Sequence, residues 1–242
     1  MTTIHLGQER GQHLRRPRRR DGNHLVPTLL VFAAIAFSAF GYVSYVLWPR
    51  WPAPRLDDPP LPITVAGVAF RVPPAAIRVP AQRRPGAQER VDLVFLWPSL
   101  EPPDPNVKAS ADMAPESPQP SARVFMTIVA AGDTLAPAER ARTLYPRYAA
   151  AEPVPGPGGL TLLAFRDGTP YQGEDLIYDA GATAFLVRCS RNRAGPTPGT
   201  CLYERRIDAA EIVVRFPRDW LGDWRVVSGA LDRLIASVRP LR

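Results

Sequence analysis

Residues 25–48 form a stretch of 24 residues without a charged side chain, LVPTLLVFAAIAFSAFGYVSYVLW. A helix of this length would extend about 36 Å, more than the roughly 30 Å hydrocarbon core of a bilayer. The pattern therefore predicts a transmembrane helix. A cleaved signal peptide is the alternative, but its apolar region is usually about 7–15 residues long and precedes a small-residue cleavage site. We favour an uncleaved signal-anchor helix.

Residues 1–24 form a basic tail in front of this helix, with six arginines against Glu9 and Asp21. Arginines beside the first apolar span hold that side of the membrane protein in the cytoplasm. The tail therefore predicts a bacterial inner-membrane protein that crosses the bilayer once, with a cytoplasmic amino terminus and a periplasmic carboxy-terminal domain. The residues that we expect to set this topology are Arg15, Arg16, Arg18, Arg19 and Arg20.

After the helix, residues 49–61 contain five prolines and predict an extended linker. An outer domain follows over residues 62–240, where short runs rich in β-branched and aromatic residues alternate with turn residues and predict strands. Residues 98–122 contain seven prolines and few large apolar side chains, which predicts a disordered loop inside the domain. The predicted strands are a hairpin or two short strands within 62–80 and the segments 91–97, 123–130, 160–166, 175–178, 183–189, 200–207 and 210–216.

The last predicted strand alternates between apolar and charged residues. Ile212, Val214 and Phe216 share one face, while Glu211 and Arg215 take the other. This period of two is typical of an antiparallel sheet with one buried face and one face in water. Most connections are also too short for parallel crossovers.

Two helices are predicted in the outer domain. Residues 134–148 predict a short one, with Pro137 in its first turn and Pro146 near its end. A longer amphipathic helix is predicted from Asp219, where Asp219 or Asp223 can cap its start, and Pro240 lies beyond its end. The predicted fold class is therefore α+β: a single amino-terminal transmembrane helix, then an antiparallel β-sheet domain packed by a carboxy-terminal amphipathic helix. The apolar stripe of that helix comprises Trp220, Trp224, Val227, Leu231, Leu234 or Ile235, and Val238.

The order of these elements resembles PsbP/Mog1-like domains, which are small sheets backed by a terminal helix. The stretches TLAPAERARTLYPRY (134–148) and RDWLGDWRVVSGALDRLI (218–235) are similar to segments of uncharacterised bacterial single-pass membrane-anchored proteins. Neither resemblance implies an activity.

Cys189 and Cys201 are the only cysteines and bracket the turn-rich segment SRNRAGPTPGT. An even number of cysteines outside the cytoplasm favours a structural disulfide, with Cα atoms about 4.4–6.8 Å apart. A redox pair is the alternative, but it usually requires a C-x-x-C spacing. The bond would hold Arg191 and Arg193 at a hairpin tip.

The three histidines, His5, His13 and His24, all precede the predicted membrane helix. The outer domain therefore has no Ser-His-Asp or Cys-His site and no zinc site of the usual His/Cys kind. No nucleotide-binding or calcium-binding motif is present either, and we expect no cofactor and no metal. The net charge is +7, of which the tail supplies +4, so the basic composition does not predict a nucleic-acid partner.

These exclusions favour a domain that acts by binding. We expect a scaffold, assembly or accessory subunit of an envelope complex, with the lipid bilayer and an unidentified membrane or periplasmic protein as partners. The candidate partner-binding residues are Arg188, Arg191 and Arg193, although solvated arginines on a pair of strands are the simpler interpretation.

The alternative function is a carboxylate-dependent periplasmic hydrolase, which needs a pair of acidic side chains. The spacing selects no pair among the available acids. These are Asp167, Glu174, Asp175, Asp179, Glu204, Asp208, Glu211, Asp219 and Asp223.

Overall fold

The computed structural model describes residues 25–47, 53–105, 123–180, 185–192 and 199–239. The chain divides into two compact units, Met1–Arg50 and Trp51–Arg242. The basic tail and most of the proline-rich loop lie outside the described residues. The predicted division into a tail (1–24), an anchor (25–48), a linker (49–61) and a domain (62–240) stays a prediction.

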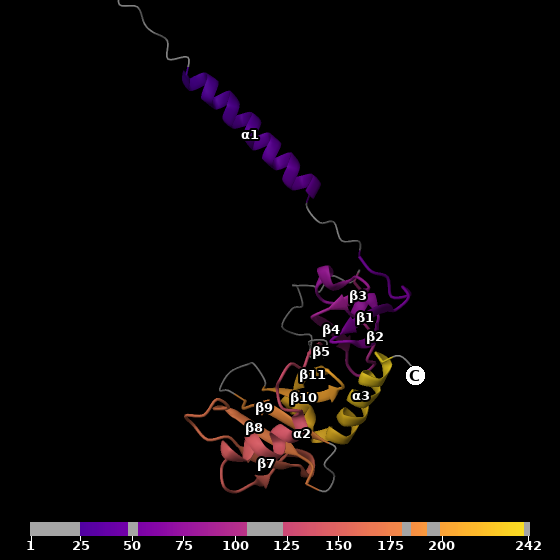
Figure 1. The fold of residues 1–242 in the computed structure, drawn as a ribbon. Helices are drawn as coiled ribbons and strands as arrows, with labels where there is room; N and C mark the ends of the chain where they lie inside the picture. The colour runs from indigo at the N-terminus through magenta and orange to yellow at the C-terminus, as the bar shows by residue number, and fades with distance from the viewer. Residues whose placement is uncertain (1–24, 48–52, 106–122, 181–184, 193–198, 240–242) are drawn as a thin grey trace, which may run out of the picture. The chain divides into compact units, whose positions relative to one another are not determined.

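The described part of the first unit is helix α1, Leu25–Leu47 (Figure 1). Within it, residues 27–46 are long and apolar enough to cross a membrane, a property that signal sequences share. Its large apolar side chains are exposed, as Phe37 and Phe40 show at 80% and 72%. A helix with these properties can be a membrane anchor or part of a signal sequence.

The second unit is built on an eight-stranded antiparallel sheet with the order β4-β5-β11-β10-β9-β8-β7-β6. Strands β6 to β11 follow one another as a meander, and the β4–β5 hairpin joins the sheet at β11. The observed sheet and helices confirm the predicted α+β class. The strands are β4 Arg90–Leu96, β5 Arg123–Ala130, β6 Val154–Pro155, β7 Thr161–Ala164, β8 Glu174–Tyr178, β9 Leu186–Ser190, β10 Thr200–Ile207 and β11 Ala210–Pro217.

A smaller sheet with the order β2-β1-β3 packs beside the β4–β5 end (Figure 1). Its first two strands form the predicted hairpin, and the turn at Ala66 and Gly67 has positive φ at both residues, as a tight two-residue hairpin turn requires. The Arg71 N–H donates to the Val238 carbonyl at 2.8 Å, which ties this sheet to the end of the terminal helix. The strands are β1 Leu61–Val65, β2 Val68–Val72 and β3 Gly86–Gln88.

The terminal helix α3, Trp224–Ser237, covers one face of the large sheet. Its buried residues pack in one core with Ile212, Val214 and Phe216 of β11, as the alternation of that strand predicts. Of the two predicted caps, Asp223 precedes the first residue of the helix, while Asp219 lies in a 3₁₀ segment, η6 Arg218–Asp223. Trp220 therefore lies before the helix and stacks on Trp97, with ring centroids 4.6 Å apart.

The loop before β7 packs tightly against the start of α3. In this loop, η5 Pro157–Gly159 places Gly158 at φ +61°, where an added Cβ would lie 2.7–2.9 Å from atoms of residues 221, 222 and 224. A glycine is required because both the backbone conformation and the available space exclude a side chain. The Trp224 indole N–H donates to the Gly158 carbonyl at 3.0 Å.

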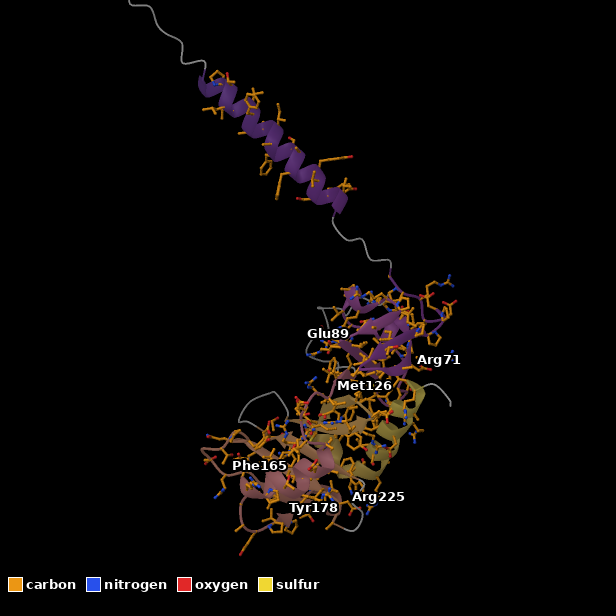
Figure 2. The ribbon with its side chains drawn as sticks, viewed as in Figure 1. Arg71, Glu89, Met126, Phe165, Tyr178 and Arg225 are labelled. Carbon is orange, nitrogen blue, oxygen red and sulfur yellow. A yellow bond between two sulfur atoms is a disulfide. The ribbon has the colours of Figure 1, made fainter. Side chains whose placement is uncertain are left out.

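A short helical segment covers the opposite face of the sheet. It comprises α2 Pro137–Glu139, a π-helical turn η3 Arg140–Leu144 and the 3₁₀ turn η4 Tyr145–Arg147. Tyr145 is buried against Phe165 and Leu176 in a second, smaller apolar core. Figure 2 shows Phe165 and Tyr178 in this part of the domain.

The expectation that Glu211 faces water was wrong, because the segment 137–147 covers this face of the sheet. Strand alternation does place Glu211 opposite the apolar face, but its exposed fraction is only 7%. The segment 137–147 and neighbouring side chains cover it. The far face of the sheet is therefore a charged interior surface in this region.

Candidate functional site

Six charged side chains interlock on the face of the sheet beneath the segment 137–147. We call these six residues the charged cluster. Three arginines and three glutamates balance in charge, and five of them lie on adjacent strands β8 to β11, while one comes from the covering segment. The members are Arg140, Arg188, Arg206, Glu174, Glu204 and Glu211.

Arg140 joins the covering segment to the sheet. Its Nη2 atom lies 2.8 Å from Glu211 Oε1 and 3.2 Å from Glu204 Oε2. Its side chain is 15% exposed, against 11% for Glu204 and 9% for Glu211. Removing one partner of a buried ion pair leaves an uncompensated charge, at a cost of about 3–5 kcal/mol. Arg140 therefore holds the segment in one position on the sheet.

The other two arginines complete the pairing. Arg188 Nη1 lies 2.6 Å from Glu174 Oε2, and its Nη2 lies 3.9 Å from Glu204 Oε1. Arg206 Nη2 lies 2.9 Å from Glu211 Oε2 and also donates to the Thr134 carbonyl at 3.0 Å. Arg206 thus holds the chain just before the covering segment.

Burial shifts the acid–base properties of this region. It raises the pKa of Glu204, although the positive charges of Arg140 and Arg188 oppose the shift. Burial lowers the pKa of Arg140, but its bond to Glu211 and the two nearby carboxylates more than reverse this, so its pKa is raised. Burial also raises the pKa of Tyr145 to about 12, so its hydroxyl stays protonated at neutral pH.

A cleft of about 610 Å³ opens beside the charged cluster. One wall is the covering segment, and the other is formed by the end of β8 and the start of β9, with β10 between them. Tyr178, at the end of β8, is labelled in Figure 2. The cleft is lined by Ala136, Pro137, Ala138, Ala141, Arg142, Tyr178, Asp179, Ala180, Phe185, Leu186, Tyr203, Glu204, Arg205 and Arg206.

A second ionic group lies next to the cysteines on the α3 face. Asp175, 3% exposed, is held by Arg191 at 2.8 Å and by Arg218 at 2.7 Å. Asp175 and Cys189 are directly opposite each other in the β8–β9 ladder. These ion pairs fix the base of the hairpin that carries the cysteines.

Cys189 and Cys201 form a disulfide in the structure. Their Cα atoms are 4.0 Å apart, closer than the predicted 4.4–6.8 Å. The two residues are direct partners in the β9–β10 ladder, and antiparallel partners at a close position bring their Cα atoms to about 4.5 Å.

The arginines proposed for partner binding are largely used inside the domain. Arg188 belongs to the charged cluster, and Arg191 also donates to the Phe165 carbonyl at 2.9 Å. Arg193 lies outside the described residues, as do Arg15, Arg16, Arg18, Arg19 and Arg20. The roles predicted for all of these arginines stay predictions.

The interpretation of the arginines between 188 and 218 as solvated needs correction. Arg188, Arg206 and Arg218 have side chains only 19%, 23% and 15% exposed, and each is paired with a carboxylate. The sequence contained one signal for these ion pairs. Glu204 and Arg206 are two residues apart on a predicted strand and therefore share a face, and that strand neighbours the strand of Arg188. Nothing in it placed Arg140 or Arg142 near that face.

Among the described residues, no group of three or more histidine, cysteine, aspartate or glutamate side chains is arranged to hold a metal ion. The six members of the charged cluster instead pair with one another, while the Nε atoms of Arg140, Arg188 and Arg206 are buried without a hydrogen-bond partner among the described residues. The arrangement offers a cleft whose lining combines apolar side chains with charged side chains that are held by ion pairs.

The fold is an α+β domain in which a meandering antiparallel sheet is covered by a terminal helix. It is similar to an immunity protein of the Stenotrophomonas maltophilia type IV secretion system, with a TM-score of 0.52 and 16% identity over 76% of this chain and 94% of that one. The Neisseria meningitidis iron-regulated outer membrane lipoprotein FrpD matches with a TM-score of 0.42 and 12% identity, over 76% and 96% of the two chains. No protein-family model matches the chain, and no curated protein sequence does. The match to the immunity protein, at 16% identity and a TM-score of 0.52, shows that the two proteins share a fold.

Proposed function

We propose that this chain is a membrane-anchored binding protein. In this proposal, α1 stays in the bacterial inner membrane, and the folded domain binds another envelope protein on the periplasmic side as a scaffold, assembly or accessory subunit. The cleft beside the charged cluster carries the proposal, since its lining combines apolar side chains with charged side chains that are held by ion pairs.

Two features support a periplasmic domain. The arginines of residues 1–24 favour a cytoplasmic tail, so the chain after α1 would lie across the membrane. The disulfide between Cys189 and Cys201 suits an oxidising compartment. The immunity protein with this fold belongs to a secretion system, and an envelope role for the present chain is in keeping with that likeness.

One observation favours the alternative of a carboxylate-dependent hydrolase. Glu204 lines the cleft and has a raised pKa, as a general acid would. Its two carboxylate oxygens, however, face Arg140 and Arg188. A carboxylate that is held by two arginines is better suited to a binding surface than to proton transfer, so the binding function is favoured.

The test is site-specific photo-crosslinking in intact cells with the full-length chain. A photoreactive residue at Ala138, which is exposed and lines the cleft, should form an adduct with one envelope protein. The same residue at Thr143, which is exposed on the same segment but does not line the cleft, is the control.

The crosslinked protein would then be purified and its Kd for the full-length chain measured. We expect Ala138→Trp to weaken this binding at least tenfold, whereas Thr143→Trp leaves it unchanged. If no envelope protein crosslinks from Ala138 in preference to Thr143, or if the purified protein does not bind, the proposal is wrong.

A further inference from the structure

Three arginines lie around Phe125, on the face of the large sheet that is opposite α3. Arg123 and Phe125 share this face of β5, the strand that carries Met126 in Figure 2, and Arg215 of β11 is directly opposite Phe125 in the ladder. Arg78, from the segment along the outer edge of β4, places its Cζ atom 4.8 Å from the centre of the Phe125 ring. We call Arg78, Arg123 and Arg215 the arginine patch.

The positive charges of the arginine patch have no partner among the residues that the structure describes. None of the three arginines forms an ion pair with a described residue, although Arg123 and Arg215 are half-buried. Withdrawing a charge from water costs free energy unless an opposite charge compensates it. The patch therefore has the character of a site for a negatively charged ligand.

A neutral group holds Arg215 in position. Its Nη1 donates to the Thr127 hydroxyl at 3.3 Å, and that hydroxyl donates to Asp92 Oδ1 at 3.0 Å. The charge of Asp92 is already compensated, because Arg90 lies 2.7 Å away and Gln82 donates to it at 3.3 Å. The guanidinium of Arg215 is thus fixed in place, while its other N–H groups make no hydrogen bond with a described residue.

The spacing of the arginine patch suits an extended polypeptide with acidic residues at alternate positions. Arg123 and Phe125 are two residues apart on β5, which is about 6.5–7 Å in a strand, and Arg78 covers Phe125. Side chains at alternate positions of an extended segment have the same spacing and point the same way. Two carboxylates with one residue between them can therefore meet Arg123 and Arg78, with Arg215 beside the second carboxylate.

The exposure of the three arginines favours such a segment over a lipid surface. A flat bilayer surface attracts basic side chains that are exposed, but only Arg78 of the patch is exposed. An extended chain that lies on the sheet also reaches half-buried side chains. Each guanidinium can then bind a carboxylate through two parallel hydrogen bonds.

We propose that the arginine patch binds an acidic segment of a partner polypeptide, in which two carboxylate side chains are separated by one residue. The segment lies extended along β5. Arg123 pairs with the first carboxylate, and Arg78 and Arg215 share the second. The inference goes beyond the proposed function, because it assigns a second binding surface that has no residue in common with the lining of the cleft.

The test measures fluorescence polarisation of labelled, amidated peptides with the full-length protein in phosphatidylcholine nanodiscs. The probes are Gly-Ser-Glu-Ser-Glu-Ser-Gly, its counterpart with Gln in place of both Glu, and Gly-Ser-Ser-Glu-Glu-Ser-Gly, in which the two acids are adjacent. We expect the first probe to bind at least tenfold more tightly than the Gln peptide, because its charge-assisted pairs are lost there. It should also bind more tightly than the peptide with adjacent acids, which has the same charge.

Matched variants locate the binding site. Arg215→Gln and Arg78→Gln should each weaken the first probe at least fivefold and leave the Gln peptide unchanged. Arg78 is exposed, so its replacement is informative even if Arg215→Gln lowers the melting temperature. Arg233→Gln is the control, since Arg233 is an exposed residue of α3 on the other side of the sheet, and it should change the Kd less than twofold.

Several outcomes would overturn the inference. These are no binding of the first probe, equal binding of the Glu and Gln peptides, and equal effects of the patch variants and Arg233→Gln. Phosphatidylglycerol vesicles that bind through Arg78 and Arg215, when no peptide does, would assign the patch to a lipid surface instead. Tighter probe binding after Asp112→Asn with Glu116→Gln would assign it to acidic residues of this chain.

Discussion

At the residue scale, the charged cluster shows what a strand pattern can and cannot reveal. Alternation along β11 correctly placed Glu211 on the face opposite Ile212 and Val214, but it says nothing about what covers that face. The cover comes from residues 137–147, far away in the sequence. The sequence therefore predicted which side chains of β11 share a face, but the prediction that Glu211 contacts water was wrong.

The disulfide was easier to foresee than the charged cluster. Two cysteines allow only one intramolecular pairing, and the turn-rich segment between them predicted facing strands. The partners of an arginine are not limited in this way, because every acidic residue of the domain is a candidate. Only the register of β8 to β11 and the position of the covering segment select Glu174, Glu204 and Glu211.

The raised pKa of Glu204 predicts how stability depends on pH. The folded chain keeps this proton to higher pH than the unfolded chain, whose ordinary value is 4.5. The contribution of Glu204 to stability therefore falls as the pH rises from about 4.5 through the raised pKa. Glu204→Gln does not titrate, so its stability relative to the wild type should rise with pH across this window.

Melting temperatures of the full-length chain and its variant at about pH 4 and about pH 7 would measure this change. Glu139→Gln is the control, because Glu139 is exposed and outside the charged cluster. A difference between Glu204→Gln and the wild type that is the same at both pH values would show that burial does not shift the titration of Glu204.

At the element scale, the long strands and the terminal helix were predictable because each carries a clear period of apolar residues. The short strands β3 and β6 were missed, since they have three and two residues and contain glycine or proline. Their pairing is set by neighbouring strands, not by their own composition. The predicted short helix at 134–148 is in fact a sequence of three different helical turns, which no local propensity distinguishes.

The packing of α3 on the sheet gives a stability prediction. Trp224 is 8% exposed, its ring centroid lies 5.2 Å from that of Phe185, and its indole N–H donates a hydrogen bond to the Gly158 carbonyl. Trp224→Ala should destabilise the domain by about 3–5 kcal/mol, because it leaves a cavity and an unpaired carbonyl. Chemical denaturation of the full-length chain in detergent would measure this.

Val226→Ala provides the matched comparison on the same helix. Val226 is 61% exposed, so its truncation should change the free energy of unfolding by less than about 0.5 kcal/mol. Equal effects of the two variants would mean that α3 does not pack on the sheet through Trp224.

At the scale of the whole molecule, the chain consists of an apolar helix and a domain with a cleft. The sequence predicted a long apolar helix followed by a folded α+β domain, since hydropathy marks the first and the periods of apolar residues mark the second. It could not predict the cleft, because four separated segments line it and their meeting depends on tertiary packing.

The central claim is that α1 anchors the chain and presents its domain outside the cytoplasm. Two fusions after Arg242 test it in intact cells, one with a reporter enzyme that is active only outside the cytoplasm and one with a fluorescent protein that matures only inside. The account predicts an active enzyme and a dark fluorescent protein, both retained in the membrane fraction. It also predicts mixed signals when Arg15, Arg16, Arg18, Arg19 and Arg20 are changed to Gln. A bright fluorescent fusion with an inactive enzyme fusion, or release of the active domain as a soluble fragment, would contradict the account.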